Sequence, residues 1–447
     1  MFKSEDTISA IATSLGEGGI SIIRVSGKNA IKINEFFFRG NIKLNEAKTQ
    51  TVHFGNFVDT NENILDEVVV TIFREPNSYT GENLIEISCH GGIFVTKKIL
   101  ETILTKCRIA ENGEFTKRRF LNGKIDISQA EAVADLISAK SESAYRSSLS
   151  QLKGSLSQKI SEIQNKLINI CSLLELELDF IEEGYEFADR NFLKQEVEST
   201  ILKIESLINS YNIGKYFRNG VRVVLIGKPN VGKSSVFNAI LEENRSIVTE
   251  IAGTTRDTIE AETNIGGTVF RFIDTAGIRE TENIVESEGV KRSLEEIEKA
   301  DLILEIFDIS NKNKLKIINQ NNKKLLIGNK VDLVCEKEYE KFENMCFVSA
   351  KNKTGFSDLK KKILEKTIYS NKNLTEIIAI TSLRHKDLLE KAKERLKISF
   401  DGMKNNISSE LISCDIRLAI NFLGEIVGKF SSEDLLNNIF SKFCIGK

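Results

Sequence analysis

Proline is almost absent from the 447-residue chain, which contains only Pro76 and Pro229. Because a proline ring breaks an α-helix, residues 77–228 can form long helices without interruption. Histidine is also scarce, with three residues, and the seven cysteines show no C-x-x-C spacing. These counts argue against a structural zinc site. They fit reduced thiols, and we predict a cytoplasmic protein.

Long apolar runs are missing as well, so the sequence predicts no membrane-spanning helix. The first residues resemble neither a signal peptide nor a transit peptide. Charge is nearly balanced, with 62 Lys and Arg against 64 Asp and Glu. A chain with balanced charge has no overall positive charge to attract nucleic acid, so any RNA contact requires local basic patches.

One motif is specific enough to predict a ligand. Residues 227–234 read Gly-Lys-Pro-Asn-Val-Gly-Lys-Ser, between the apolar run Val221–Ile226 and a helix-like segment. A glycine-rich turn at a helix N-terminus presents backbone N–H groups to a phosphate chain. Lys233 reaches the outer phosphates and Ser234 offers a hydroxyl to Mg²⁺. The sequence therefore predicts a nucleoside triphosphate site.

Three further motifs follow in order, each after an apolar run. Asp274-Thr275-Ala276-Gly277 places an acid for Mg²⁺, through water, and a glycine N–H for the γ-phosphate. Asn329-Lys330-Val331-Asp332 indicates guanine, because the Asp332 carboxylate accepts from the N1–H and the 2-amino group together. Asn329 suits the purine edge, the Lys330 stem covers the base, and Ser349-Ala350-Lys351 closes the pocket. The bound nucleotide is predicted to be GTP or GDP.

The pattern of the rest predicts a multidomain α/β protein. Residues 1–120 form an α+β domain, with strands at Ile20–Val25, Thr51–Val58, Glu67–Phe73 and Leu84–Cys89 and a helix at Ile93–Thr105. Helical periodicity marks 121–217 and again 373–447. Residues 218–372 read as a Ras-like P-loop GTPase domain with a doubly wound, mostly parallel sheet. We therefore expect an all-helical domain that is split in sequence by an inserted GTPase domain.

The first long helix is predicted to begin with the capping box Ser128-Gln129-Ala130-Glu131. Its apolar stripe is expected to run on from Val133 to Leu174. The Asn/Lys-rich segment Asn311–Lys324 is interpreted as an exposed helix or loop without chemistry.

Several longer segments together resemble the tRNA-modification GTPase family MnmE, also called TrmE, over essentially the whole chain. They are Asp6–Ala10, Arg24–Gly27, Asn77–Glu82, Cys89–Gly92, Gly113–Lys124, Ile251–Asp257 and the ending Phe443–Lys447. Prolines that many members carry are replaced here by Ser14-Leu15 and Asn112, which removes rigidity but no proposed ligand.

The resemblance implies a homodimer that acts on tRNA with an FAD-dependent partner, MnmG or GidA, in a hetero-oligomer. Together they would add an aminomethyl or carboxymethylaminomethyl group to C5 of the wobble uridine. The one-carbon donor would be a tetrahydrofolate derivative, in the 5-formyl or methylene form. GTP hydrolysis would gate this reaction, and no membrane is involved.

The resemblance also implies how GTP is hydrolysed. Ile278 stands where Ras-like enzymes have a water-orienting Gln, so K⁺ and dimerisation of two GTPase domains would replace the missing groups. The K⁺ ligands carry over to Asn230, Thr249, Ile251 and Thr254, and the Mg²⁺ ligands to Ser234 and Thr255. Glu286 matches the acid that positions water and Lys233 assists catalysis. The remaining nucleotide contacts are Val231, Gly232, Ser235, Glu250, Ala252 and Gly253.

Arg24, Glu86, Lys124 and Lys447 match the folate-contacting positions of the family. Cys444 can be interpreted as a core thiol, as an irregular prenylation box or, following the family, as a catalytic or structural group beside the folate.

The candidates for tRNA contact are basic clusters, which can equally be solvated surface. They are Lys117-Arg118-Arg119 with Lys124, and Lys97-Lys98 with Lys106 and Arg108. An alternative function is a ribosome-assembly GTPase that binds rRNA, but this function needs an RNA-binding appendage, and the flanking sequences do not show one.

Overall fold

The computed structural model describes residues 6–179, 189–242, 259–274, 295–311, 323–335, 345–368, 379–429 and 433–447. Two compact units are present. The first comprises Met1–Ala134, Gln151–Lys166 and Ile420–Lys447, and the second comprises Asp135–Ser150 and Leu167–Ala419.

The first unit contains a seven-stranded sheet in the order β3-β4-β5-β6-β2-β1-β7. Its neighbours are antiparallel, apart from the parallel pair β1 and β7. The strands are β1 Ile8–Ile11, β2 Gly18–Ser26, β3 Phe38–Gly40, β4 Thr51–Val58, β5 Ile64–Phe73, β6 Leu84–Gly91 and β7 Arg108–Ile109. The four strands predicted from β-branched and aromatic residues are all present, and β4 has the predicted bounds.

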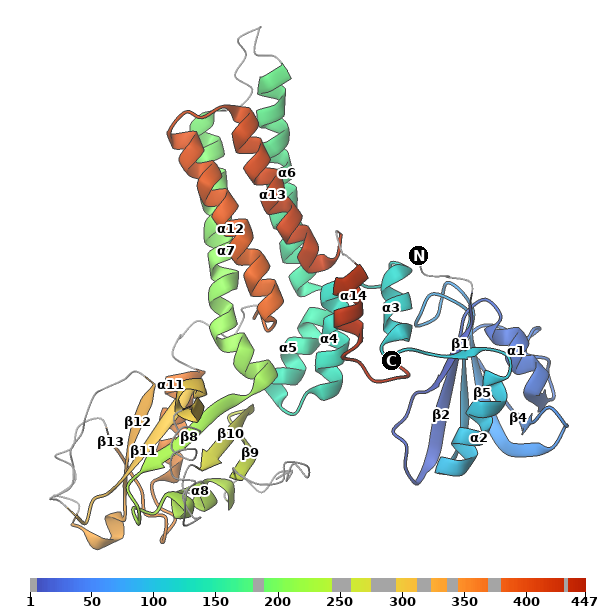
Figure 1. Ribbon diagram of the computed structural model, residues 1–447, viewed down its shortest axis with the longest axis horizontal. Helices are drawn as coiled ribbons and strands as arrows, with labels where there is room; N and C mark the ends of the chain where they lie inside the picture. Colours follow the sequence, from blue (N-terminus) through green and yellow to red (C-terminus); the bar gives the residue numbers. More distant parts are fainter. Residues whose placement is uncertain are drawn as a thin grey trace, which may run out of the picture. The chain divides into compact units, whose positions relative to one another are not determined.

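Two helices, α1 Ala30–Phe37 and α2 Ile93–Leu104, pack on this sheet (Figure 1). Alternate strand residues point toward them, because successive side chains of a strand face opposite sides. The shared core includes Phe37, Phe57, Ile72 and Ile99, all of them fully buried. This arrangement confirms an N-terminal α+β domain.

The helices α3 Glu114–Leu121, α4 Ile127–Ser138 (through Ala134) and α14 Glu433–Phe440 form a second cluster in the same unit (Figure 1). Ile127, Phe440 and Phe443 are among its buried side chains. The contact between α3 and α14 thus joins segments from opposite ends of the chain.

The predicted capping box at Ser128–Glu131 was wrong by two residues. Helix α4 begins after Asp126, whose carboxylate accepts from the Gln129 N–H at 2.9 Å, while Gln129 Oε1 accepts from the Asp126 N–H at 3.0 Å. The reciprocal pair is therefore Asp126 with Gln129. Ser128 Oγ instead donates to Asp126 Oδ1 at 2.8 Å.

The apolar stripe predicted from Val133 to Leu174 is divided among three helices: α4, α5 Glu142–Leu152 and α6 Ser155–Asp179. Gly154, with φ +87°, separates the last two in a conformation that side chains rarely adopt. Six later members of the stripe are buried as predicted: Leu156, Ile160, Ile163, Leu167, Cys171 and Leu174.

In the second unit, α7 Arg190–Asn219 and α12 Leu383–Lys404 lie side by side (Figure 1), and α13 Ser409–Val427 follows, with its residues up to Ala419 in this unit. The returning chain passes very close to α7 at Gly214, where a Cβ atom would lie 2.2 Å from the Ile380 carbonyl oxygen. Ile380 N–H also donates to Ser210 Oγ at 3.0 Å. Helical segments from before and after the inserted domain therefore pack together, which confirms the split helical domain.

The inserted domain has a six-stranded sheet in the order β13-β12-β11-β8-β10-β9, parallel except between β9 and β10. This is the doubly wound fold predicted from the sequence. The strands are β8 Val221–Gly227, β9 Ile259–Ile265, β10 Thr268–Asp274, β11 Leu302–Asp308, β12 Lys324–Asn329 and β13 Met345–Phe347. The described helical elements include α8 Lys233–Glu242, a helical segment at 295–299, the 3₁₀ turn η4 Val331–Leu333 and α11 Phe356–Thr367.

Among the described helices, none combines the length and the apolar character needed to cross a membrane. The interpretation of Asn311–Lys324 falls mostly outside the described residues.

Candidate functional site

The predicted phosphate loop joins β8 to α8 as expected. Asn230 and Gly232 adopt positive φ values of 65° and 90°, so the loop curls before the first turn of α8. Lys233 Nζ lies over the loop, where it donates to the carbonyl oxygens of Gly227 at 3.2 Å and Lys228 at 3.1 Å. The ammonium group is thus positioned at the loop where phosphates bind in P-loop proteins.

Asn329 connects this loop to the predicted base pocket. Its Nδ2 donates to the Val231 carbonyl oxygen at 3.0 Å, and its Oδ1 accepts from the Ala350 N–H at 3.1 Å. The side chain is buried, and a Cβ atom on Gly232 would lie only 2.4 Å from Asn329 Nδ2. Gly232 is therefore needed for this approach, and Asn329 organises the pocket from within. Its contact with the purine edge stays a prediction.

The other base-pocket residues are held by short hydrogen bonds. Ser349 Oγ donates to Asp332 Oδ1 at 2.6 Å and orients that carboxylate. Lys330 Nζ contacts Asp308 Oδ2 at 2.6 Å and the Asn230 carbonyl oxygen at 3.0 Å, so it braces the phosphate loop. Burial raises the pKa of Asp308, but Lys330 and Ser310 outweigh this effect and lower the pKa overall. Asp308 was missed from the sequence, although its position at a strand end was a usable signal.

The remaining nucleotide and metal predictions cannot be placed in this way. Asp274 ends β10 beside Leu225 of β8, and only its backbone is described. Ser234 and Ser235 lie in the first turn of α8, and Lys351 follows Ala350 in an exposed turn. The following predicted residues lie outside the described part of the chain: Thr249, Glu250, Ile251, Ala252, Gly253, Thr254, Thr255, Thr275, Ala276, Gly277, Ile278 and Glu286.

A second site lies on the N-terminal sheet. Arg24 of β2 and Glu86 of β6 are direct cross-strand neighbours, and Arg24 Nε donates to Glu86 Oε1 at 2.6 Å. Arg24 Nη1 also donates to the Gly446 carbonyl oxygen at 3.4 Å. Burial lowers the pKa of Lys447, the neighbouring Arg24 charge lowers it further, and Glu86 opposes both. Three of the four predicted folate positions therefore converge from opposite ends of the chain.

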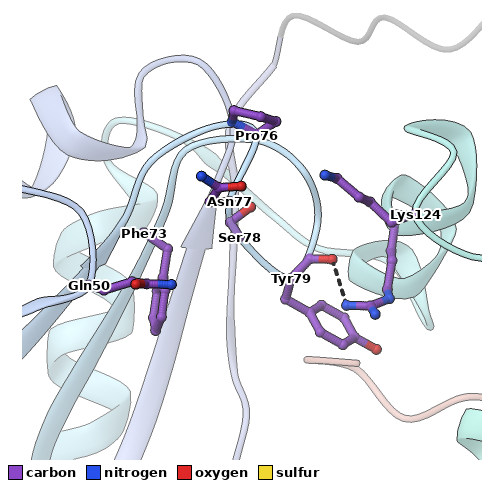
Figure 2. A pocket seen from close by; sticks show the side chains of 8 residues that line it. Gln50, Phe73, Pro76, Asn77, Ser78, Tyr79 and Lys124 are labelled. Atoms are coloured by element: carbon purple, nitrogen blue, oxygen red, sulfur yellow. Dashed lines mark hydrogen bonds between the residues drawn. The ribbon is translucent and has the colours of Figure 1, made fainter.

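The fourth position, Lys124, lies in a cavity of about 460 Å³ whose walls are mostly polar (Figure 2). Tyr79 links this cavity to Arg24, because the Arg24 and Arg119 guanidinium carbons lie 5.6 and 4.6 Å from its ring centroid. Arg119 Nη1 also donates to the Tyr79 carbonyl oxygen at 3.1 Å. The cavity is lined by Gln50, Phe73, Pro76, Asn77, Ser78, Tyr79, Arg119 and Lys124.

Tyr79 was not predicted as a site residue, and Arg119 was predicted only as a candidate for tRNA contact, although both lie inside motifs that carried the family resemblance. Their roles depend on cation–π geometry between distant segments, which the sequence alone does not display.

The last residues are held against the sheet by backbone contacts. Gly446 has φ +96°, and a Cβ atom there would lie 2.2 Å from the Ile11 carbonyl oxygen. Ile445 forms an antiparallel bridge with Asn112, and the Cys444 carbonyl oxygen accepts from the Gly113 N–H at 3.4 Å. Cys444 itself is exposed, so the interpretation as a buried core thiol was wrong.

Two of the eight basic residues proposed to contact tRNA are buried inside the protein. Arg118 is buried and pairs with Asp6 at 2.6 Å, Glu114 at 2.9 Å and Glu82 at 3.1 Å. Lys117 is buried and donates to Asn437 Oδ1 at 2.9 Å. Buried, paired charges cannot form an RNA-binding surface, so the prediction was wrong for these two residues.

The other basic candidates are exposed, apart from the half-buried Arg119. Arg108 pairs with Asp6 and Glu114, and Lys106 Nζ lies 4.3 Å from the Phe36 ring centroid. Lys97 and Lys98 are exposed on α2, and their contact with tRNA stays a prediction.

Comparison with known proteins covers the whole chain. Residues 7–124 match the family described as GTP-binding protein TrmE N-terminus, and residues 127–444 match the MnmE helical domain. Proteins named tRNA modification GTPase MnmE from Flavobacterium johnsoniae and Clostridioides difficile are each 44% identical, over 99% of this chain and 100% and 99% of their own lengths. The Bacteroides thetaiotaomicron protein of the same name is 40% identical, over 99% of this chain and 100% of its own.

Among solved structures, the G domain of the T. maritima FeoB iron transporter is 27% identical and covers 33% of this chain and 98% of its own. Its TM-score of 0.25 is too low to support a structural argument. The relatives and the two family matches agree with the nucleotide loop, the split helical domain and the N-terminal sheet described above. The chain therefore belongs to the MnmE family of tRNA modification GTPases.

Proposed function

We propose that this GTPase works with an FAD-dependent partner subunit of the MnmG type to modify C5 of the wobble uridine in tRNA. The added group is aminomethyl or carboxymethylaminomethyl, and its carbon comes from a tetrahydrofolate derivative. The observation that carries the proposal is the convergence of Arg24 and Glu86 with Lys447, in a chain that matches its relatives from end to end.

The nucleotide site supports selection of guanine. Ser349 leaves Asp332 with a second carboxylate oxygen, and a carboxylate has acceptor sites enough for two donors from the base. Lys233 and the loop N–H groups hold the phosphates, while Ser234 supplies a hydroxyl to Mg²⁺.

K⁺ is proposed to supply positive charge to the transition state of hydrolysis, as an arginine finger does in other GTPases. Asn230 fits one ligand position, because its side chain is exposed on the loop and its backbone is fixed by Lys330. Thr249, Ile251 and Thr254 would complete the K⁺ site, Thr255 the Mg²⁺ site, and Glu286 would orient water in a dimer of GTPase domains.

The cation proposal predicts hydrolysis in K⁺ that is at least about tenfold faster than in Na⁺, equal to about 1.4 kcal/mol of barrier. Turnover measured in matched chloride salts tests this prediction, and equal rates in both salts would exclude a K⁺-specific site.

The N-terminal site fits a folate by its chemistry. A carboxylate such as Glu86 can accept from an amino-pyrimidine edge, while Arg24 holds Glu86 in place through a charge-assisted hydrogen bond. Arg119 and Lys124 offer cationic partners for a ligand carboxylate in the adjoining cavity. Cys444 is exposed two residues before Gly446, so its thiol is available to a bound ligand; its chemical role is left open.

The whole proposal is tested by mass spectrometry of wobble uridines in tRNA from cells that lack this protein. Loss of the C5 group, restored by the wild-type gene, is expected. Normal modification in the deletion strain would refute the proposal. A Cys444→Ser variant that hydrolyses GTP but leaves tRNA unmodified would place the thiol in the modification step.

A further inference from the structure

The β9–β10 hairpin is placed to respond to the bound nucleotide. Three residues, 256–258, separate the predicted nucleotide segment 249–255 from the start of β9 at Ile259. β10 ends at Asp274, the first residue of the Asp-Thr-Ala-Gly motif. The two strands are paired along their full length, from Ile265 and Thr268 to Ile259 and Asp274. A paired hairpin moves as one piece, so a displacement at its nucleotide end also reaches its turn.

The turn of the hairpin is bound by the start of α5. Ser143 donates to the Gly267 carbonyl oxygen twice, from its N–H at 3.0 Å and from its hydroxyl at 2.6 Å. The same hydroxyl lies 3.0 Å from Thr268 Oγ1, which belongs to a buried side chain. Ser141 caps the first turn of α5 by accepting from the Ala144 N–H at 3.2 Å, so this start is well ordered for the contact.

A second contact lies along the strands. Lys140 Nζ donates to Glu262 Oε2 at 2.8 Å, and Arg271 Nε lies 3.0 Å from Glu262 Oε1. Glu262 is buried and is the cross-strand neighbour of Arg271. A buried carboxylate needs compensating charge. Glu262 of β9 receives this charge from Arg271 of β10 and from Lys140, so Lys140 is bound to both strands of the hairpin through Glu262.

The segment that makes these contacts, Asp135–Ser150, belongs to the same compact unit as the nucleotide domain. The chain before it, through Ala134, and after it, from Gln151, belongs to the other unit. The inserted domain is also joined to the helical domain by the chain itself, where α7 leads into β8 and where the chain returns to α12. The contacts of Lys140 and Ser143 with the hairpin are additional to these two connections.

We propose that Lys140 and Ser143 are positioning residues that couple the nucleotide state of the β9–β10 hairpin to Asp135–Ser150. Neither residue touches the nucleotide. Their contacts transmit a displacement of the hairpin to Asp135–Ser150, and the chain on both sides of this segment belongs to the first unit. This inference requires GTP hydrolysis by the chain, and its consequence for tRNA rests on the proposed function.

The direct test is hydrogen exchange of the full-length protein, comparing GDP with GDP and aluminium fluoride, in Mg²⁺ and K⁺. We expect amide exchange within 135–150 to differ at least about fivefold between the two states, the lower end of typical coupling effects. The Ser143→Ala and Lys140→Met variants should lose this difference. No difference in the wild-type protein, or an unchanged difference in both variants, would overturn the proposal.

A matched control lies on the same helix. Arg146 forms an i,i+4 ion pair with Glu142, and both side chains are largely exposed. Arg146→Ala therefore removes an ion pair from α5 without touching the hairpin, and the exchange difference should remain. Lys140→Arg keeps the charge and should restore the difference that Lys140→Met removes, which a general loss of folding would not explain.

The functional consequence is measured separately. Strains carrying Ser143→Ala or Lys140→Met should hydrolyse GTP within about threefold of wild type while tRNA modification falls about tenfold, within the usual range of coupling between sites. If the wild-type strain modifies no tRNA, the proposed function fails and the exchange test still stands. If the variants lose the exchange difference yet modify tRNA normally, the coupling is not used in modification and this consequence is overturned.

Discussion

The nucleotide site and the N-terminal site are built in opposite ways. In the nucleotide site, short segments follow parallel strands, and Asn329 joins two of them through backbone groups. In the N-terminal site, charged side chains from separate segments meet around Arg24, and the same domain holds a second charged cluster, which is buried, around Arg118. The first kind of site can be recognised from local sequence motifs, whereas the second depends on contacts between residues far apart in the sequence.

This difference predicts different weaknesses. A site held by backbone groups should tolerate loss of a charge but lose specificity when a base-reading group changes. A site held by buried ion pairs should lose stability when one partner is removed, because the remaining charge stays buried without compensation.

The largest expected effect is the removal of Arg118. Arg118→Ala leaves Glu82 without its Arg118 partner and Glu114 with Arg108, and should destabilise the N-terminal α+β domain by about 3 kcal/mol. Hydrogen exchange of β2 and α3 would measure this loss locally. Arg39→Ala, which removes the exposed Arg39–Glu62 pair on the same sheet, should cost under about 1 kcal/mol. Equal losses in both variants would contradict the comparison.

The next effect concerns the base pocket. Asp332→Asn replaces an acceptor of the guanine edge with a donor, and should weaken GTP binding about a hundredfold, or about 2.7 kcal/mol, while improving binding of xanthosine triphosphate. Fluorescent-nucleotide titration of both ligands checks the exchange of preference. Asp358→Asn, at an exposed acid on α11, serves as control and should leave both affinities unchanged. If Asp332→Asn unfolds the domain and does not change its nucleotide preference, the result would show that Asp332 stabilises the domain.

A smaller effect depends on pH. Burial raises the pKa of Glu114, but hydrogen bonds from Arg108, the Glu111 N–H and Arg118 outweigh it, so the pKa lies below 4.5. A carboxyl group with a lowered pKa stabilises the fold above pH 4.5, and this contribution is lost as pH falls through the folded-state pKa. The protection of amides in β7 and α3 from exchange, relative to the intrinsic exchange rate at each pH, should therefore fall below pH 4.5. Arg118→Ala should reduce this acid sensitivity, and an unaltered pH profile in the variant would argue against the network.

The smallest effect tests the aromatic link between the cavity and Arg24. Tyr79→Leu removes the ring between the two guanidinium groups and should weaken binding of a tetrahydrofolate derivative by about 1 kcal/mol. Tyr79→Phe keeps the ring and should bind nearly as well as wild type, although it loses the 3.0 Å contact with Thr116 Oγ1. Isothermal titration distinguishes the two. A greater loss in Tyr79→Phe than in Tyr79→Leu would assign the effect to the hydroxyl group.

The sequence predicted what depends on short-range order. Strand β4, the doubly wound sheet and the loop around Lys233 follow from alternation, apolar runs and glycine positions. It also predicted the split helical domain, because periodicity returns after the inserted domain.

The predictions that were wrong depended on which of several polar groups form hydrogen bonds or ion pairs with each other, whether the groups are near or far apart in the sequence. Asp126 is the cap because its carboxylate accepts from the Gln129 N–H while Gln129 Oε1 accepts from the Asp126 N–H, and neighbouring candidates cannot be ranked from spacing alone. Lys117 and Arg118 look like surface charges until the acids around them are known. Their neighbours come from as far away as Asp6 and Asn437, and no local pattern records such pairs.

The contact of Arg24 with Gly446 spans 422 residues, and this separation affects how the protein is made. Ribosomes add about 5–20 residues per second, so the two partners are synthesised roughly 20–85 s apart. During that interval Arg24 and Glu86 have emerged, but the tail that lies against β1 has not. The domain that is translated first is therefore among the last to complete its site, and a truncated product would carry an intact sheet with an unfinished pocket.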